Sequence, residues 1–122
     1  MTPAPEPTQS FATAIASGRF LVTTEEPPPK GADLTSFLRR TQRLRGLVDS
    51  IALTEASGAV MTMSPIGAVP SLLAQGHQPI LQITCRDRNR IALQADLLAA
   101  AALGVTTVAC MAGDAITDAG RD

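Results

Sequence analysis

Residues 78–114 read QPILQITCRDRNRIALQADLLAAAALGVTTVACMAGD, a pattern that predicts a strand, a helix and a second strand. The apolar run 80–84, or 80–85, predicts the first strand. Between 91 and 102, apolar residues recur at helical spacing on two adjacent stripes, and we expect so wide a face to pack on a sheet. Gly104 ends this helix, and 105–111 predicts the second strand. Two strands joined in this way are expected to be parallel, with a right-handed crossover.

The same alternation extends toward the amino terminus. Residues 20–24 and 48–54 predict two further strands. The predicted helices cover 11–17, about 34–44, and a segment that begins at either Pro65 or Pro70 and ends near Gly76. The sequence therefore predicts an α/β fold of parallel β/α units, with about four strands and three to four helices. Two architectures fit: a small open sheet with helices on both faces, or the first half of an eight-stranded β/α barrel.

Composition excludes several classes of protein. The 122 residues are 45% hydrophobic and carry a formal net charge of −1, with three Phe and no Trp or Tyr. This balance favours one folded domain and argues against a nucleic-acid partner. Cys85 and Cys110 lie far apart in a chain with one His, so we expect no metal site and no disulfide framework.

Two segments bear on location. Residues 1–10 are Pro-rich and lack Lys and Arg, so we expect a disordered tail rather than a signal peptide, followed by a domain over 11–122. The uncharged stretch 97–113 is interpreted as a buried helix and strand rather than a membrane span. We therefore expect a cytoplasmic protein with no membrane partner.

Polar residues follow each predicted strand, and the carboxyl ends of parallel strands meet at one edge of a sheet. They are Glu25, Thr54 with Glu55, Cys85 to Asp87, and Asp114. A carboxylate on a rigid, dry strand end, such as Glu25, can have a raised pKa and donate a proton. Gly113 lacks a side chain, so a flat ligand could approach the backbone beside Asp114. Polar strand ends are also what ordinary loops provide, and periodicity alone leaves both interpretations open.

The remaining polar and sulfur-containing residues receive structural interpretations. Glu26 is expected to point away from Glu25 into solvent. Among the arginines at 86, 88 and 90, pairing with Asp87 is favoured over phosphate binding. Cys85 and Cys110 are expected to be buried, and His77 to lie on the surface at the end of the sheet away from the site.

Several of these segments resemble the methylenetetrahydrofolate reductase family. The matching segments are EEPPPKG at 25–31, TEA at 54–56, QPILQITCRDRN at 78–89, ALQADLL at 92–98, ALGV at 102–105 and GD at 113–114. The match is most similar to the reductase domain of the type fused to homocysteine S-methyltransferase. It spans about Phe20 to Asp114, which is less than half of a complete family member.

The resemblance implies a β/α barrel that binds FAD. Family members reduce 5,10-methylenetetrahydrofolate to 5-methyltetrahydrofolate with NAD(P)H, in one-carbon metabolism and methionine biosynthesis. Glu25 matches the general acid that protonates the folate, and Asp114 matches the Asp that binds the pterin near the flavin. Thr54 matches a flavin contact, and Gly113 belongs with Asp114 to the expected cofactor-binding set. The implied partners are a folate substrate and a nicotinamide nucleotide, and the hydride chemistry belongs to the flavin.

The chain also departs from the family pattern. Ala112 and Ala115 replace residues that flank Gly-Asp in relatives, and the later barrel strands are missing. We expect an open barrel that self-associates without holding FAD, because it exposes its inward side chains, which are Val22, Leu53, Ile83 and Val108 or their immediate neighbours. A homo-oligomer or a complementary chain would complete it. The alternatives are a non-catalytic flavin- or pterin-binding module and a barrel-completing subunit of a split enzyme.

Overall fold

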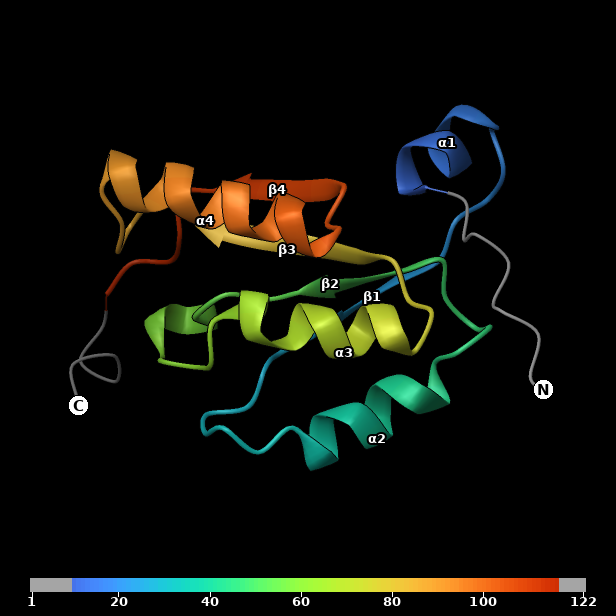
Figure 1. The fold of residues 1–122 in the computed structure, drawn as a ribbon, viewed down its shortest axis with the longest axis horizontal. Coiled ribbons are helices and arrows are strands. Elements are labelled where there is room, and N and C mark those ends of the chain that lie inside the picture. Colours follow the sequence, from blue (N-terminus) through green and yellow to red (C-terminus); the bar gives the residue numbers. More distant parts are fainter. Residues whose placement is uncertain (1–9, 117–122) are drawn as a thin grey trace.

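A four-stranded parallel sheet, with strand order β1-β2-β3-β4, organises the computed structural model, which describes residues 10–116 (Figure 1). The strands are β1 (Thr23–Glu26), β2 (Ser50–Leu53), β3 (Pro79–Thr84) and β4 (Thr107–Met111). The helices are α1 (Phe11–Ala16), α2 (Thr35–Arg43), α3 (Val69–Ala74) and α4 (Arg90–Leu103), with short 3₁₀ turns at Ser57–Ala59 and Pro65–Ala68. Every neighbouring pair of strands is parallel, as the alternation predicts.

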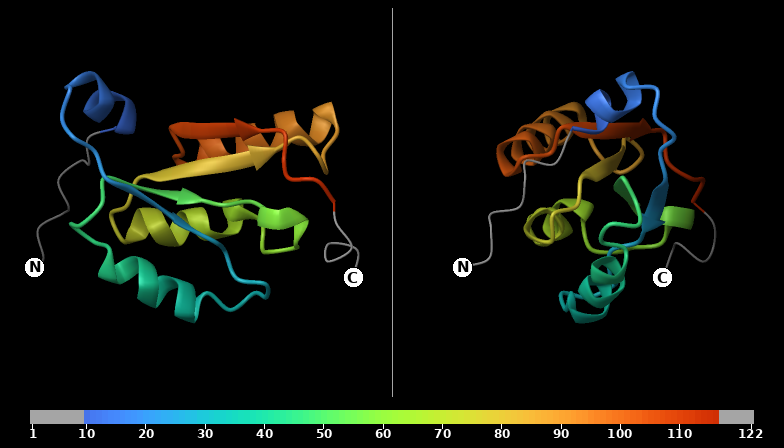
Figure 2. Two further views of the ribbon diagram at one scale, coloured as in Figure 1. Left: turned by 180° about the vertical axis from the view of Figure 1, so that it is seen from behind. Right: turned by 90° about the vertical axis from the view of Figure 1, so that its right-hand side faces the viewer.

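The strand register divides the sheet into two faces. Glu26, Leu53 and Leu81 are register partners, so their side chains lie on one face. Helices α2, α3 and α4 cover that face, while α1 lies near the amino ends of the strands (Figures 1 and 2). The right-hand view of Figure 2 shows these three helices on the outside of a curved sheet. This arrangement is that of a barrel segment, not of an open sheet with helices on both faces.

The apolar core lies between the sheet and its helices. It contains Phe37 from α2, Val69 and Leu72 from α3, and Ile51, Leu53 and Leu81 from the strands. Leu53 and Ile83 therefore face the helices, and both are buried. The prediction named these residues or their immediate neighbours as the interior set: Leu53 and Ile83 themselves face the helices, whereas their immediate neighbours face the barrel interior. The expectation that the whole apolar face of α4 packs on the sheet is wrong, because Ile91 and Leu98 are exposed.

Two helix boundaries follow from local chemistry. Asn89 caps α4, since its side chain accepts a hydrogen bond of 2.9 Å from the Ala92 N–H. Gly104 ends the helix in the left-handed region, with φ +105°. The two predicted starts of the third helix are both used: Pro65 opens the 3₁₀ turn, and Pro70 lies in the first turn of α3.

Strand β1 begins later than predicted and includes Glu25 and Glu26. Its ladder starts at Thr23 because its partner strand starts at Ser50. Immediately before it, the Asp49 carboxylate accepts a hydrogen bond of 2.8 Å from the Val22 N–H. Glu26 pairs with Arg40 at 3.1 Å, so the expectation that it is solvated is wrong.

Three further residues differ from expectation in their exposure. His77 is buried, with Nε2 2.7 Å from the Thr41 carbonyl, because α2 packs over the end of the sheet where it lies. Cys85 and Cys110 are exposed rather than buried. Cys110 belongs to β4, which has a partner on one side only, and Cys85 lies just beyond the end of β3. Within the described range, no helix is long and apolar enough to cross a membrane.

Candidate functional site

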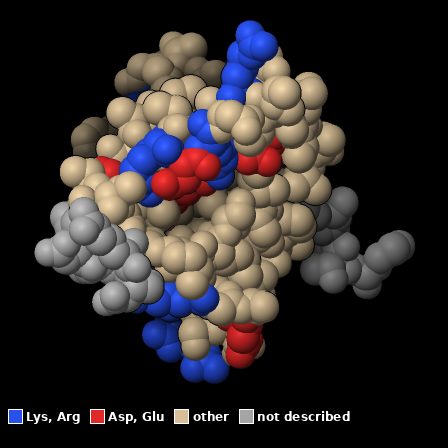
Figure 3. All heavy atoms as spheres, turned by 90° about the vertical axis from the view of Figure 1, so that its left-hand side faces the viewer, with Lys and Arg blue, Asp and Glu red and all other residues tan. Residues whose placement is uncertain are grey.

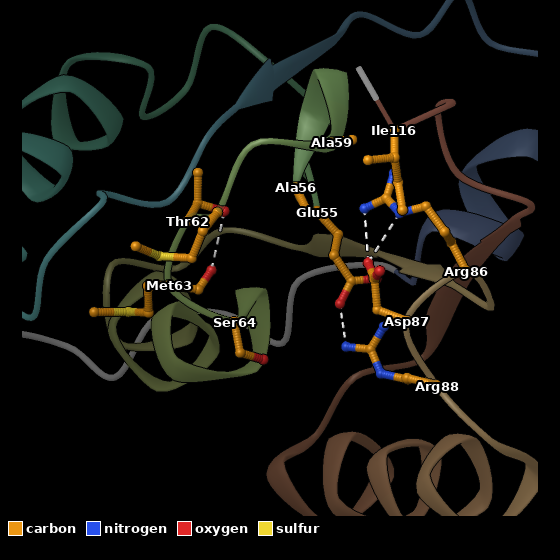
Figure 4. Close-up of a pocket in the computed structure, with 11 residues that line it drawn as sticks. Glu55, Ala56, Ala59, Thr62, Met63, Ser64, Arg86, Asp87, Arg88 and Ile116 are labelled. Atoms are coloured by element: carbon orange, nitrogen blue, oxygen red, sulfur yellow. Dashed lines mark hydrogen bonds and ion pairs between the residues drawn. The ribbon is translucent and has the colours of Figure 1, made fainter. Parts of the chain in front are cut away.

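The carboxyl ends of the strands form one hollowed edge of the molecule. Figure 3 looks onto this edge, where acidic and basic side chains gather beside a hollow. One cavity of about 400 Å³ lies at the ends of β3 and β4, and its lining includes Gln82, Thr84, Met111, Ala112, Gly113 and Asp114. A second cavity of about 450 Å³ lies beside it, and Glu55 lines both (Figure 4).

Glu25 lies near the end of β1 on the concave face of the sheet, away from the helices. Gln82 of β3 donates a hydrogen bond from Nε2 to Glu25 Oε1 at 3.1 Å. Gln82 also lines the 400 Å³ cavity, so it connects the carboxylate to the cavity wall. Glu25 is exposed rather than dry, because no described helix covers this face.

Thr54 and Glu55 follow β2 and have different environments. Thr54 is buried and lines neither of these two cavities. Glu55 accepts a hydrogen bond of 2.5 Å from the Thr84 N–H and forms an ion pair with Arg88. Glu55 therefore joins the ends of β2 and β3.

Arg88 is held on three sides. In addition to Glu55, it donates to Asp96 Oδ2 at 2.8 Å from Nε and to the Thr84 carbonyl at 3.0 Å from Nη1. The hydrogen bonds to Glu55 and Asp96 hold the pKa of Arg88 above its ordinary value, although burial opposes this shift. Sequence reasoning expected Arg88 to pair with Asp87, and the actual partners lie 33 and 8 residues away along the chain.

Arg86 supports the turn after β4. Its guanidinium donates to Asp87 Oδ2 at 2.7 Å and to the Asp114 carbonyl oxygen at 2.8 Å. The pairing with Asp87 is the one that the sequence favours, and it lowers the pKa of Asp87. Gly113 has φ +88°, and a Cβ there would lie 3.0 Å from the Arg86 Cβ. The left-handed φ favours glycine at 113, and the close contact with Arg86 leaves little room for a side chain.

The Asp114 carboxylate links the loop after β4 to the loop after β2. Its Oδ2 accepts a hydrogen bond of 2.6 Å from the Gly58 N–H, 56 residues away. The loop after β2 turns sharply here, with left-handed φ values at Ala56, Gly58 and Ala59. Gly58 is not among the predicted site residues, although a Ser-Gly pair such as Ser57-Gly58 is typical of a turn.

Thr84 is the last residue of β3, and both its backbone N–H and its carbonyl oxygen form hydrogen bonds with side chains. Its N–H donates to Glu55 and its carbonyl accepts from Arg88. Its side chain is 3% exposed and lines the 400 Å³ cavity, and Oγ1 has no hydrogen-bond partner within residues 10–116. A buried hydroxyl without a partner is costly, so this atom is available to a ligand in the cavity.

The structure thus brings together part of the predicted set. Gly113 and Asp114 line one cavity. Glu25 accepts a hydrogen bond from Gln82, which lines the same cavity. Thr54 lies at the same edge but outside both cavities. In the part of the chain that the structure covers, no three His, Cys, Asp or Glu side chains gather to hold a metal ion.

Comparison with known proteins assigns the family. The family model described as methylenetetrahydrofolate reductase matches residues 10–121, which is nearly the whole chain. A comparison with curated proteins gave no match. The family match and the parallel β/α sheet with its helices on one face agree, and they confirm the resemblance to the family and the predicted fold class. The similarity to the type fused to homocysteine S-methyltransferase stays a prediction. The chain belongs to the methylenetetrahydrofolate reductase family.

Proposed function

We propose that this chain supplies one half of a flavin-dependent site that reduces 5,10-methylenetetrahydrofolate to 5-methyltetrahydrofolate with NAD(P)H. The family match supports this reaction. The observation that carries the proposal is the placement of Glu25 and Asp114 on two different strand ends at one concave edge, with Gln82 between them. Strands that pair with β1 and β4 would complete the barrel.

The cavity at the ends of β3 and β4 fits the ring system of FAD. Its wall combines the apolar Met111 and Ala112 with the unpartnered hydroxyl of Thr84. Gly113 lets the backbone of this wall approach Arg86 closely, since a Cβ there would lie 3.0 Å from the Arg86 Cβ. In this proposal Thr84 and Gly113 hold the flavin edge, while Thr54 contributes from the neighbouring strand end. When bound, FAD supplies the hydride chemistry.

Glu25 acts as the general acid. Protonation of a folate ring nitrogen opens the imidazolidine ring and produces a cationic iminium on the substrate. The proton donor must stand within hydrogen-bond reach of that nitrogen. Gln82 holds Glu25 Oε1 at 3.1 Å, and Glu25 is exposed on the concave face. The concave position admits a substrate, whereas Glu26 on the other face is held by Arg40.

Asp114 binds the pterin and offsets the positive charge on the iminium. One of its carboxylate oxygens is held by the Gly58 N–H, and this bond fixes the side-chain orientation. An anion that is held in advance stabilises a developing cation at little reorganisation cost.

The test uses the chain in a full-length context, with the strands that complete the barrel. Glu25→Gln keeps the shape but cannot donate the proton, so we expect folate reduction to fall at least about 100-fold. Flavin reduction by NADH should stay near the parent rate. Glu26→Gln is the matched control, since it makes the same change one residue away on the opposite face. Equal folate reduction in Glu25→Gln and the parent would remove Glu25 from the acid role.

Asp114→Asn tests the second carboxylate. We expect the folate half-reaction to slow by up to about 3 kcal/mol of activation free energy, and the nicotinamide half-reaction to slow less. Rapid-mixing absorbance measurements on each half-reaction separate the two. Equal slowing of both would assign Asp114 a structural role in the turn with Gly58.

A further inference from the structure

Two adjacent carboxyl groups of β1 have partners of different kinds. Glu26, on the face that the helices cover, pairs with the Arg40 guanidinium at 3.1 Å. Glu25, on the concave face, accepts a hydrogen bond of 3.1 Å from the side-chain amide of Gln82. A cation beside a carboxyl group favours the ionised form, whereas a neutral amide donates a hydrogen bond without adding a charge. The partner of Glu25 is therefore the kind that suits a group that must gain and lose a proton.

Gln82 is a fixed partner because it belongs to the interior of the sheet. It lies within β3, which has a strand on each side, and its register partner on β4 is Ala109. Gln82 is 8% exposed, and its neighbours Leu81 and Ile83 are buried against the helices. Glu25, in contrast, is exposed. Holding an exposed glutamate in one orientation costs side-chain entropy, and a hydrogen bond from a fixed residue offsets this cost.

The hydrogen bond also determines which carboxyl oxygen carries the proton. Gln82 donates from Nε2 to Oε1 of Glu25. In a protonated carboxyl group, the oxygen that accepts an N–H bond is the carbonyl oxygen, so the proton occupies Oε2. The same hydrogen bond persists after the proton leaves, because a carboxylate oxygen accepts it as well. Gln82 therefore holds Glu25 in one orientation in both protonation states.

Gln82 connects this carboxyl group with the cavity in which the proposed reaction takes place. It lines the 400 Å³ cavity together with Thr84, which lies two residues further along β3 and therefore on the same face of the sheet. The residue that holds the acid is thus part of the cavity wall. This arrangement keeps the acid at the rim of the cavity.

We propose that Gln82 is a positioning residue for folate reduction, whose amide holds Glu25 with the acidic proton on Oε2. This inference rests on the proposed function, because Gln82 acts only through Glu25. The folate half-reaction requires proton donation and should depend on Gln82. The nicotinamide half-reaction does not use this proton and should not.

Measurement of the two half-reactions, in the full-length context described above, tests this role. Gln82→Met keeps the length of the side chain and removes its polar atoms, so the folate half-reaction should slow at least about tenfold. Flavin reduction by NADH should stay near the parent rate. Gln78→Met is the matched control, because Gln78 lies at the amino end of β3 and lines a different cavity, and it should leave both rates unchanged. A parent-like folate rate in Gln82→Met would overturn the proposal.

A double-mutant cycle separates action through Glu25 from a structural effect on the cavity. Gln82→Met should slow the folate half-reaction of the parent and leave that of the Glu25→Gln variant nearly unchanged. Equal slowing in both backgrounds would contradict the positioning role. If Glu25→Gln alone reduces folate at the parent rate, the general-acid role fails, and the positioning role fails with it. A slow Glu25→Gln variant beside a parent-like Gln82→Met variant removes the positioning role alone.

The contact itself can be tested in the purified 122-residue chain, without cofactor or substrate. Nuclear magnetic resonance detects the side-chain N–H signals of Gln82. Glu25→Ala removes their acceptor and should shift these signals, whereas Glu26→Ala, on the other face of the sheet, should leave them in place. Unshifted signals in Glu25→Ala would show that Gln82 does not hold Glu25, and this result would overturn the proposal independently of any activity.

Discussion

The two faces of the sheet differ in composition and in what they do. On the face that the helices cover, Ile51, Leu53 and Leu81 are almost completely buried. On the concave face, the polar side chains of Glu25, Gln82 and Thr84 gather at the carboxyl edge. Because successive strand residues alternate between the faces, one short segment contributes to both. Stability is thus concentrated on one side of the sheet, and the proposed chemistry on the other.

The buried ion pair between Arg88 and Glu55, at the carboxyl edge of the sheet, tests whether stability depends on the helix-covered face alone. Its removal should give the largest loss of stability. Arg88→Leu leaves Glu55 without its partner, and the free energy of unfolding should fall by about 3–5 kcal/mol. Denaturant titration measures this change. Arg39→Leu is the control, since Arg39 is exposed and has no partner in the described range, and it should change stability by less than about 0.5 kcal/mol. A small effect of Arg88→Leu would mean that the carboxyl edge contributes little to stability.

Adjacent residues of β3 sharpen the comparison. Leu81→Ala opens a cavity against the helices and should lower the free energy of unfolding by about 3 kcal/mol. Gln82→Ala, on the concave face, should cost less than about 1 kcal/mol and should release Glu25 from its hydrogen bond. The same titration compares both. If the two substitutions cost equally, the division between the faces would not hold.

The smallest effect is expected at the amino ends of the strands. The Val22 N–H and then Arg19 hydrogen-bond to Asp49 and hold its pKa below the ordinary value of 3.8. A lowered folded-state pKa stabilises the fold above the unfolded pKa, and this contribution is lost as pH falls through the folded pKa. Asp49→Asn should therefore lower Tm at pH 6, and its difference from the parent should shrink below about pH 4. A Tm difference that is the same at pH 6 and pH 2 would exclude titration of Asp49 as its source.

Much of this organisation follows from local patterns. The strand–helix alternation predicts parallel strands, and this places Glu25 and Asp114 at one edge because the carboxyl ends of parallel strands coincide. The end of α4 at Gly104 also follows from residue type and position. Each of these inferences depends on neighbours in the sequence or on a general rule of β/α topology.

The contacts that shape the site depend on long-range packing and could not be predicted in the same way. Glu55 and Arg88 lie 33 residues apart, and pattern alone favoured the adjacent Asp87 as the partner. The burial of His77 depends on α2 reaching over the end of the sheet. The sequence also left the phase of β2 and β3 open, since Leu53 and Ile83 lie in apolar runs whose alternation does not say which face is covered.

The bond between Asp114 and Gly58 has a consequence for the order of folding. The segment from 57 to 59 precedes Asp114 by more than 50 residues, and the intervening chain contains α3, β3, α4 and β4. During synthesis, β2 can pair with β3 before β4 has left the ribosome. The loop at Gly58 can form its hydrogen bond only after Asp114 has been synthesised. Contacts between distant residues carry a larger loop-closure entropy and tend to form late. We therefore expect the contact between Asp114 and Gly58, and the proposed cavity beside it, to form after β2 has paired with β3.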